Sequence, residues 1–391
     1  MRLWESQNSE FRNPAEIVSY WQDACRIDPL LLEFETAGQW WSALHDSGIT
    51  LLVTREYEHL LLGMYVHDSD GPTVSMMRMP HPSGIAVNQS QRVVHVASTR
   101  NPNQIFDLMP VDGSLPRLDL KEVSLHDRPL LPVRTSFYPG CLYTHDLAMI
   151  GDRLHANSVG QNAIVKLSGS GAYERVWWPK CIETDNGPVF QQNHLQLNSI
   201  AAGPTLETSF FSASTDEISS VRPGDPSFPV DGRGVIFSGA TREPIARGLT
   251  RPHSARLHNQ KIWVENSGYG QIGYIDGEKF QSVANLPGWT RGLCFFNEIM
   301  FVGTSRILSR FQQYAPGVNI DLSCCGIHAL DIKSGLSLGS IIWPHGSQIF
   351  GIEAVPCDFT TGFAFPADGR SLEHIGHDLF YTFQMNFPQE D

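Results

Sequence analysis

The sequence of 391 residues has no apolar run of 18 or more residues, so we expect no transmembrane helix. Its first residues, Met1 to Ser6, lead into polar residues and not into an apolar stretch, so we expect no secretory signal. No block of five or more basic residues occurs, and the formal net charge is −13. Such a chain repels nucleic-acid backbones and anionic membranes on average. We therefore expect neither of these partners.

The seven cysteines are an odd number and have no Cys-x-x-Cys spacing, which argues against a zinc finger and against a disulfide scaffold. Reduced thiols in the cytoplasm are the expectation. No glycine-rich segment leads into a helical pattern, so no nucleotide cofactor is predicted. Ser83 lacks the Gly-x-Ser-x-Gly context of an α/β-hydrolase nucleophile.

Glycine and proline are abundant, with 34 and 25 copies. So many turn-forming residues argue against a helical bundle. A hydrophobic content of 41% and a charged content of 18% are typical of a chain that buries a core. The length suits two or three ordinary domains or one large β architecture.

The first 47 residues differ from the remainder. Pro14 opens a segment, Ile17 to Ile27, in which apolar residues recur at helical spacing, and Ala37 to His45 fits a second short helix. After Gly48 the pattern changes to short β-branched and aromatic runs separated by turn residues. We predict an N-terminal helical extension over 1–47, which fits either a cap on its own chain or a bridge in a dimer. A β domain follows over 48–391.

A motif of one polar residue, one small residue and then aliphatic residues recurs six times. The copies begin at Ser83, His145, Asn198, His253, Arg291 and Glu353. Their spacings suit the blades of a propeller with loop insertions.

A second motif, an apolar run ending in small polar residues, also has six copies. These endings are Thr54-Arg55-Glu56, Ser98-Thr99-Arg100, Asn157-Ser158, Ser214-Thr215-Asp216, Asn266-Ser267-Gly268 and Thr304-Ser305-Arg306. The first of them precedes every copy of the first motif. A closed ring explains this shift if strands from both chain ends share the last blade. We predict an all-β, six-bladed β-propeller; the rival, a pair of β-sandwiches, does not explain two matching counts.

The first motif marks the innermost strand of each blade, so its six polar residues form a ring at one channel mouth. Residues two positions earlier point the same way on an extended strand and form a second tier. That tier contains His81, Tyr143, Gln196, Arg251, Trp289 and Gly351. The candidate catalytic residues are His145, His253, Arg291 and Glu353. The candidate substrate-binding residues are His81, Ser83, Tyr143, Asn198, Arg251 and Trp289.

Three hypotheses account for this ring. In the first, His145, His253 and Glu353 hold a divalent metal from alternate blades, and iron, zinc or manganese suits this ligand set better than calcium. In the second, Glu353 or a histidine is a general base, and Arg291 stabilises a developing anion. In the third, the polar residues satisfy one another and the propeller is a binding or scaffolding module.

The charged residues of the two tiers indicate what kind of molecule the channel mouth binds. Arg251 and Arg291 stand beside titratable residues in an otherwise acidic protein, which would focus an anion at the mouth. We expect an enzyme that acts on a small polar, anionic molecule, with a non-catalytic propeller for ligand or protein binding as the alternative.

Three segments carry a family resemblance: Arg251–Leu257, Asn266–Gly270 and Pro287–Leu293. They resemble an uncharacterised bacterial family of conserved hypothetical proteins, over most of the chain after about Gly48. More distantly, the blade pattern is similar to six-bladed propellers of the strictosidine-synthase, gluconolactonase and NHL type. That resemblance implies a site at one mouth of the channel. The two ring histidines depart from the carboxylate and amide ligands of the gluconolactonases, which argues against calcium lactonase activity.

Overall fold

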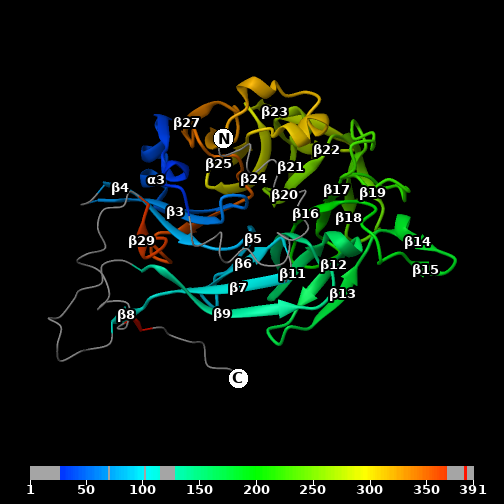
Figure 1. Cartoon of the computed structure of the whole chain (residues 1–391), viewed down its shortest axis with the longest axis horizontal. Coiled ribbons are helices and arrows are strands. Elements are labelled where there is room, and N and C mark those ends of the chain that lie inside the picture. Colours follow the sequence, from blue (N-terminus) through cyan, green and yellow to red (C-terminus); the bar gives the residue numbers. More distant parts are fainter. Residues whose placement is uncertain (1–26, 69–70, 101–102, 115–127, 368–382, 385–391) are drawn as a thin grey trace.

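The structure is a computed structural model that describes residues 27–68, 71–100, 103–114, 128–367 and 383–384. Within these residues, six antiparallel sheets of four or five strands are arranged around a central channel (Figure 1). The predicted all-β, six-bladed propeller is therefore confirmed. The helix expected over Ile17 to Ile27 lies outside the described residues, apart from Ile27 itself.

The first three blades follow one another along the chain, each running from the innermost strand outward. Blade one contains β5 (Pro82–Asn88), β6 (Val93–Ser98), β7 (Asn103–Pro110) and β9 (Leu130–Tyr138). Blade two contains β10 (Thr144–Ile150), β11 (Arg153–Ser158), β12 (Ala163–Leu167) and β13 (Tyr173–Trp177). Blade three contains β16 (Leu197–Ala201), β17 (Phe210–Ala213), β18 (Gly234–Ser238) and β19 (Pro244–Leu249).

The other three blades complete the ring. Blade four contains β20 (Pro252–His258), β21 (Lys261–Asn266), β22 (Gln271–Asp276) and β23 (Lys279–Asn285). Blade five contains β24 (Trp289–Phe296), β25 (Ile299–Ser305), β26 (Gly326–Asp331), β27 (Ser337–Ile342) and, outermost, β1 (Glu35–Gly38). Blade six contains β28 (Gly351–Pro356), β2 (Ile49–Arg55), β3 (Leu60–His67), β4 (Gly71–Arg78) and β29 (Phe365–Pro366).

The remaining elements are short. Two small pairs join β8 (Gly113–Ser114) to β30 (Phe383–Gln384) and β14 (Glu183–Thr184) to β15 (Gly187–Pro188). The helices are α3 (Trp40–Ser47) and the 3₁₀ turns η2 (Pro29–Leu32), η3 (Val159–Gln161), η4 (Lys180–Ile182), η5 (Ser267–Tyr269), η6 (Ser309–Tyr314) and η7 (Ile320–Leu322). Among the described residues, no helix has the length and hydrophobicity needed to cross a membrane.

Blade six closes the ring with strands from distant parts of the chain. The innermost strand β28 pairs with β2, and Thr54 lies opposite Gly351. The Thr54 hydroxyl accepts a hydrogen bond from the Gly351 amide at 2.8 Å and donates one to the Ser83 carbonyl of blade one at 2.6 Å. As predicted, strands that are far apart in sequence share this blade.

The small residue in the first motif has a steric explanation. A Cβ atom on Gly84 would lie 2.6 Å from the Cα atom of Asp146 in the next blade. A Cβ atom on Gly292 would lie 2.8 Å from Cγ1 of Ile352, and Gly292 also has a left-handed φ of +92°. The innermost strands thus approach closely at these two positions, and only glycine fits there.

The segment before Gly48 differs in part from the prediction. The helix expected over Ala37 to His45 begins only at Trp40, because residues Glu35–Gly38 pair with β27 as an additional strand. Gly48, at φ +62°, ends the helix in a left-handed cap. Trp40 is buried and packs edge-on against Phe301, with ring centroids 6.0 Å apart. This contact fixes α3 to the core beside blades five and six.

Candidate functional site

A cavity of about 170 Å³ lies at the end of the channel where the innermost strands begin. Five of the six blades contribute to its wall. Its charged and imidazole side chains are Glu56, His145, Arg222, Arg251, His253, Arg291 and Arg306, and its aromatic side chains are Tyr57, Tyr143, Trp289, Phe311, Tyr314 and Phe350. Four arginines against one carboxylate make this wall cationic in an acidic chain.

The backbone before the innermost strands is conformationally unusual. His81, Tyr143, Gln196 and Arg251 all have left-handed φ angles, between +43° and +52°. None of them is glycine or asparagine, so each conformation costs about 1–3 kcal/mol. Three of these four residues line the cavity. The strained loop geometry thus directs their side chains to this end of the channel.

Two arginines are stacked on aromatic rings. The Arg291 guanidinium carbon lies 3.3 Å from the Phe350 ring centroid, and that of Arg251 lies 4.1 Å from the Tyr314 centroid. No hydrogen bond or ion pair joins the side chain of Arg291 to another described residue. Burial lowers the pKa of both guanidiniums, that of Arg251 to about 10. Each also lies close enough to add to the repulsion on the other.

Both histidines of the cavity are neutral. Burial, followed by the charge of Arg291, lowers the pKa of His145 and of His253 well below the usual range. Nδ1 of His253 lies 2.8 Å from the Arg251 carbonyl oxygen. Since a carbonyl only accepts, Nδ1 carries the proton and donates it, and Nε2 is left as a hydrogen-bond acceptor.

Three buried polar atoms of this wall have no hydrogen-bond partner among the described residues. They are Nε of Arg251, Nδ1 of His145 and Oε1 of Gln348, on side chains that are 7%, 7% and 8% exposed. Buried polar groups are almost always paired, by protein, water or ligand. The polar groups of this wall are therefore incompletely paired within the protein.

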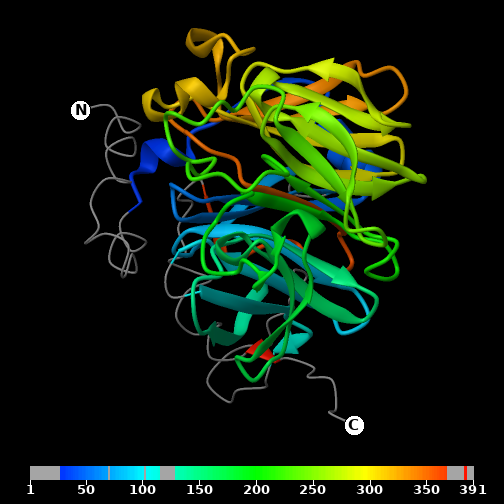
Figure 2. The same cartoon turned by 90° about the vertical axis from the view of Figure 1, so that its right-hand side faces the viewer.

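Two long loops meet over the cavity. The loop between β17 and β18 brings Phe228 and Val230 against Tyr314 of η6, which follows β25. The Tyr314 hydroxyl donates a hydrogen bond to the Gly224 carbonyl. Figure 2 shows the gold segment with η6 and η7 projecting from one face of the propeller. Both loops contribute residues to the cavity wall, among them Arg222 and Phe311.

We expect Tyr314→Phe to loosen this cover, because the substitution removes one hydrogen bond, about 1 kcal/mol, and keeps the ring. Hydrogen exchange should become faster in residues 214–233 and 306–325, while the melting temperature changes little. Tyr274→Phe, at a partly buried tyrosine in blade four, is the matched control. Unchanged exchange in both loops would contradict this prediction.

Of the ten site residues predicted from the sequence, six line the cavity and four do not. The cavity wall brings together Tyr143, His145, Arg251, His253, Trp289 and Arg291. Ser83 and Asn198 instead link adjacent blades, because Ser83 donates to the Thr144 carbonyl at 3.0 Å and Asn198 to the Pro252 carbonyl at 3.0 Å. His81 lies beside Glu56, with Nδ1 and Oε1 3.8 Å apart, but is not itself part of the wall.

Glu353 lines a different cavity, and strand register explains why. In five innermost strands the ladder shifts register near the first-motif residue, which is the mark of a β-bulge. The ladder of β28 shows no shift. In blade five Thr290 pairs with Thr304, and in blade six Gly351 pairs with Thr54, so Thr290 and Gly351 occupy equivalent positions. The blade-six residue equivalent to Arg291 is therefore Ile352. Glu353 is therefore one residue further along the channel than the sequence motif implied.

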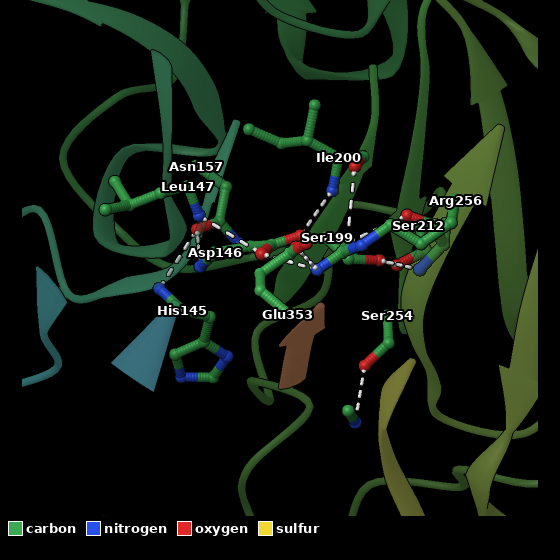
Figure 3. A network of polar contacts seen from close by, with 12 residues as sticks. His145, Asp146, Leu147, Asn157, Ser199, Ile200, Ser212, Ser254, Arg256 and Glu353 are labelled. Carbon is green, nitrogen blue, oxygen red and sulfur yellow. Dashed lines mark hydrogen bonds and ion pairs between the residues drawn. The ribbon is translucent and has the colours of Figure 1, made fainter. Parts of the chain in front are cut away.

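The same register corrects the second tier and bears on the metal hypothesis. The blade-six member of the second tier is Phe350, which lines the cavity, and not Gly351. The geometry does not bring His145, His253 and Glu353 together, since Glu353 is nearest to Arg256 (Figure 3). Among the described residues, no three His, Cys, Asp or Glu side chains are grouped to hold a metal ion. A metal at this site stays a prediction.

Sequence reasoning missed several residues of the wall. Glu56 and Arg306 stand at the third position of the second motif, in the endings that were expected to reach this face. That position is the signal by which both could have been found. Arg222, Phe311 and Tyr314 come from long loops outside both repeats, and no repeat pattern marks them.

The model of a protein family described as a domain of unknown function (DUF4915) matches residues 38–361. The chain belongs to this family. The match spans most of the propeller, and the resemblance to an uncharacterised family is confirmed. A search of curated proteins finds no match.

Solved structures share the fold of this DUF4915 protein. One from a nidogen/laminin complex has a TM-score of 0.51 at 9% identity, covering 78% of this chain and 98% of that one. A putative gluconolactonase has a TM-score of 0.47 at 14% identity, covering 82% and 89%. A gluconolactonase from Xanthomonas campestris has a TM-score of 0.42 at 16% identity, covering 76% and 86%. At these identities the likeness concerns the fold alone.

Proposed function

We propose that this protein is an enzyme that binds a small anionic molecule in the cationic cavity and transfers a proton to or from it. The observation that carries the proposal is the Arg291 guanidinium, which is stacked on Phe350 and has no polar protein partner among the described residues. The Phe350 ring covers one face of the guanidinium and leaves its N–H edge for a ligand. A carboxylate or phosphate group matches that edge with two parallel hydrogen bonds.

Arg251 supports the same ligand class. Its guanidinium is buried, donates to the Ser214 hydroxyl at 3.2 Å and leaves Nε unpaired. Two neighbouring buried cations repel each other, and a bound anion relieves that repulsion. The unpaired Gln348 oxygen accepts hydrogen bonds, so the preferred molecule also carries a hydroxyl or amide donor. Trp289 and Tyr143 line the wall beside the histidines and suit its less polar part.

The histidines supply the chemistry in this proposal. His253 Nε2, fixed as an acceptor by the bond from Nδ1, takes a proton from the substrate. Arg291 stabilises the negative charge that develops when the proton leaves. His145 and Glu56 are further groups on the same wall that can exchange protons with the substrate. Such a set serves elimination, isomerisation or hydrolysis.

A metabolite screen tests this proposal. Purified wild type and Arg291→Ala are incubated with a cell extract, and mass spectrometry follows which anionic metabolites decline. Thermal shifts with the active fractions report binding. We expect a metabolite consumed by wild type and not by Arg291→Ala, while Arg153→Ala, at an exposed arginine, matches wild type. If no small molecule is bound or consumed, and a protein partner binds Arg291→Ala as well as wild type, the protein is a binding module.

Ligand affinity should depend on pH. In the free protein both imidazoles are neutral near pH 7, because their pKa values are well below the usual range. A bound anion favours the imidazolium form of His145 and raises its pKa, so binding takes up a proton, while His253 Nε2 stays free to accept the substrate proton. Affinity should therefore increase as the pH falls from 8 to 5, by at most about tenfold per pH unit for each proton.

Calorimetry measures this uptake directly. The observed binding enthalpy is compared in two buffers with different ionisation enthalpies, using an anion that does not titrate in the range. The difference should shrink in His145→Gln, at the other histidine of the cavity wall. An affinity that rises with pH, or no proton uptake, contradicts the prediction.

A further inference from the structure

A second cavity, of about 250 Å³, lies at the opposite end of the channel. The innermost strands all begin at the first cavity, so their later residues meet at this other end. The wall is mostly aliphatic and includes Val87, Leu147, Met149, Ile200 and Leu257. Its charged members are Arg256 and Glu353. This end therefore has very few charged side chains, and partly exposed aliphatic side chains such as Val87, Met149 and Leu257 form part of its lining.

Arg256 is already engaged. Its guanidinium donates to both carboxylate oxygens of Asp146, at 2.8 and 3.3 Å, and to the Ala255 carbonyl at 3.0 Å (Figure 3). Asp146 is satisfied in turn, because it also accepts hydrogen bonds from the Leu147 and Ile200 amides. The pair is thus complete without Glu353.

Glu353 is left without a hydrogen-bond donor among the described residues. Its nearest cation is Nη2 of Arg256 at 3.7 Å, which is an ion pair too long for a hydrogen bond. The side chain is 25% exposed, into the cavity. With Asp146 counted, two carboxylates face one guanidinium, so this end of the channel has one negative charge in excess when Glu353 is ionised. Glu353 thus has a cation nearby but no cation that donates a hydrogen bond to it.

The chemistry of the wall limits what that partner is. The oxygens of Asp146 are occupied, so Glu353 alone does not form a metal site, and no group of metal ligands occurs in the described chain. A small cation with a short alkyl chain fits the aliphatic part of this wall better than a bulky cation does. An ammonium group provides up to three donors and a positive charge.

We propose that this end of the channel is a second binding site, for a small primary ammonium ion with a short alkyl chain. The ammonium group donates to the Glu353 carboxylate, and the alkyl chain packs against Val87, Met149 and Leu257, which are only partly buried. This site is separate from the anion cavity and does not depend on the function proposed for it.

Binding at this site should strengthen as the pH rises. Burial raises the pKa of Glu353 to about 7, with Asp146 raising it further and Arg256 opposing the shift. Cys294 of β24 is the other titratable group that interacts with Glu353, and its thiol stays protonated because burial raises its pKa. The ionised carboxylate binds the cation, so affinity should increase from pH 6 to pH 8.

The test titrates the full-length protein with n-butylammonium chloride and follows binding by ligand-observed NMR at pH 8. We expect saturable binding, at least about tenfold weaker binding to Glu353→Gln, and no saturable binding of n-butanol or butyrate. Ala202→Trp fills the cavity and leaves the charges unchanged, so it should weaken binding as well. Arg291→Ala, in the other cavity, should bind butylammonium like wild type.

Two results would overturn the proposal. One is the absence of saturable butylammonium binding to wild type up to about 50 mM. The other is equal binding to wild type and to both Glu353→Gln and Ala202→Trp, with circular dichroism confirming that at least one variant is folded. Loss of anion binding without loss of butylammonium binding affects only the function proposed for the first cavity.

Discussion

Replacing Arg291 with methionine is expected to weaken binding of the anionic ligand by about 2–5 kcal/mol, because the ligand loses a buried, hydrogen-bonded cation. In affinity this is about thirtyfold or more. The stability of the free protein should change in the opposite direction. Arg291 has no polar partner among the described residues and repels Arg251, whereas methionine fills the space without a charge. Calorimetric titration and thermal unfolding measure the two effects.

Opposite signs distinguish a binding residue from a structural one. Replacing a structural arginine lowers both the stability of the protein and its affinity for the ligand. Replacing a residue that serves only the ligand lowers the affinity alone. Arg153→Met, at an arginine with 70% of its side chain exposed, is the control and should change neither quantity. If Arg291→Met binds the ligand like wild type, or if it lowers both quantities together, the role given to Arg291 is wrong.

The fold was predictable because each blade repeats the same physical constraints. The innermost strands need a small residue such as Gly84 or Gly292 where neighbouring blades approach closely. The second strands end in small polar residues, such as Thr54, whose hydroxyl links adjacent blades. Such constraints leave a recurring pattern in the sequence, and the equal counts of the two motifs predicted six blades and the shared closure.

The site was less predictable because it depends on features that differ between blades. A single bulge residue decides whether a side chain faces one cavity or the next, and no sequence pattern in β28 shows that its bulge is missing. Glu353 was therefore placed one residue too close to the histidines. Arg222 and Tyr314 belong to loops whose position depends on packing against each other. Such contacts have no local signature.

Asp146→Ala is expected to give the largest loss of stability, about 3–5 kcal/mol, because it leaves the Arg256 guanidinium without its main partner in the channel. Asp146 belongs to blade two, and its carboxylate binds the Ile200 amide of blade three and Arg256 of blade four (Figure 3). The substitution thus breaks contacts among three blades at once. Denaturant unfolding of the full chain measures the loss.

Two variants decide whether the loss comes from the unpaired cation. Asp152→Ala removes a carboxylate that is 84% exposed and 3.5 Å from Arg153, so it should leave the unfolding midpoint nearly unchanged. In Asp146→Ala/Arg256→Met the uncompensated charge is also removed, and part of the lost stability should return. If Asp146→Ala costs less than about 1 kcal/mol, or if the double variant is no more stable than the single one, the ion pair does not hold these blades together. Recovery in the double variant would instead identify Asp146 as the counterion that allows a guanidinium to lie in the channel, leaving Glu353 available to a different cation.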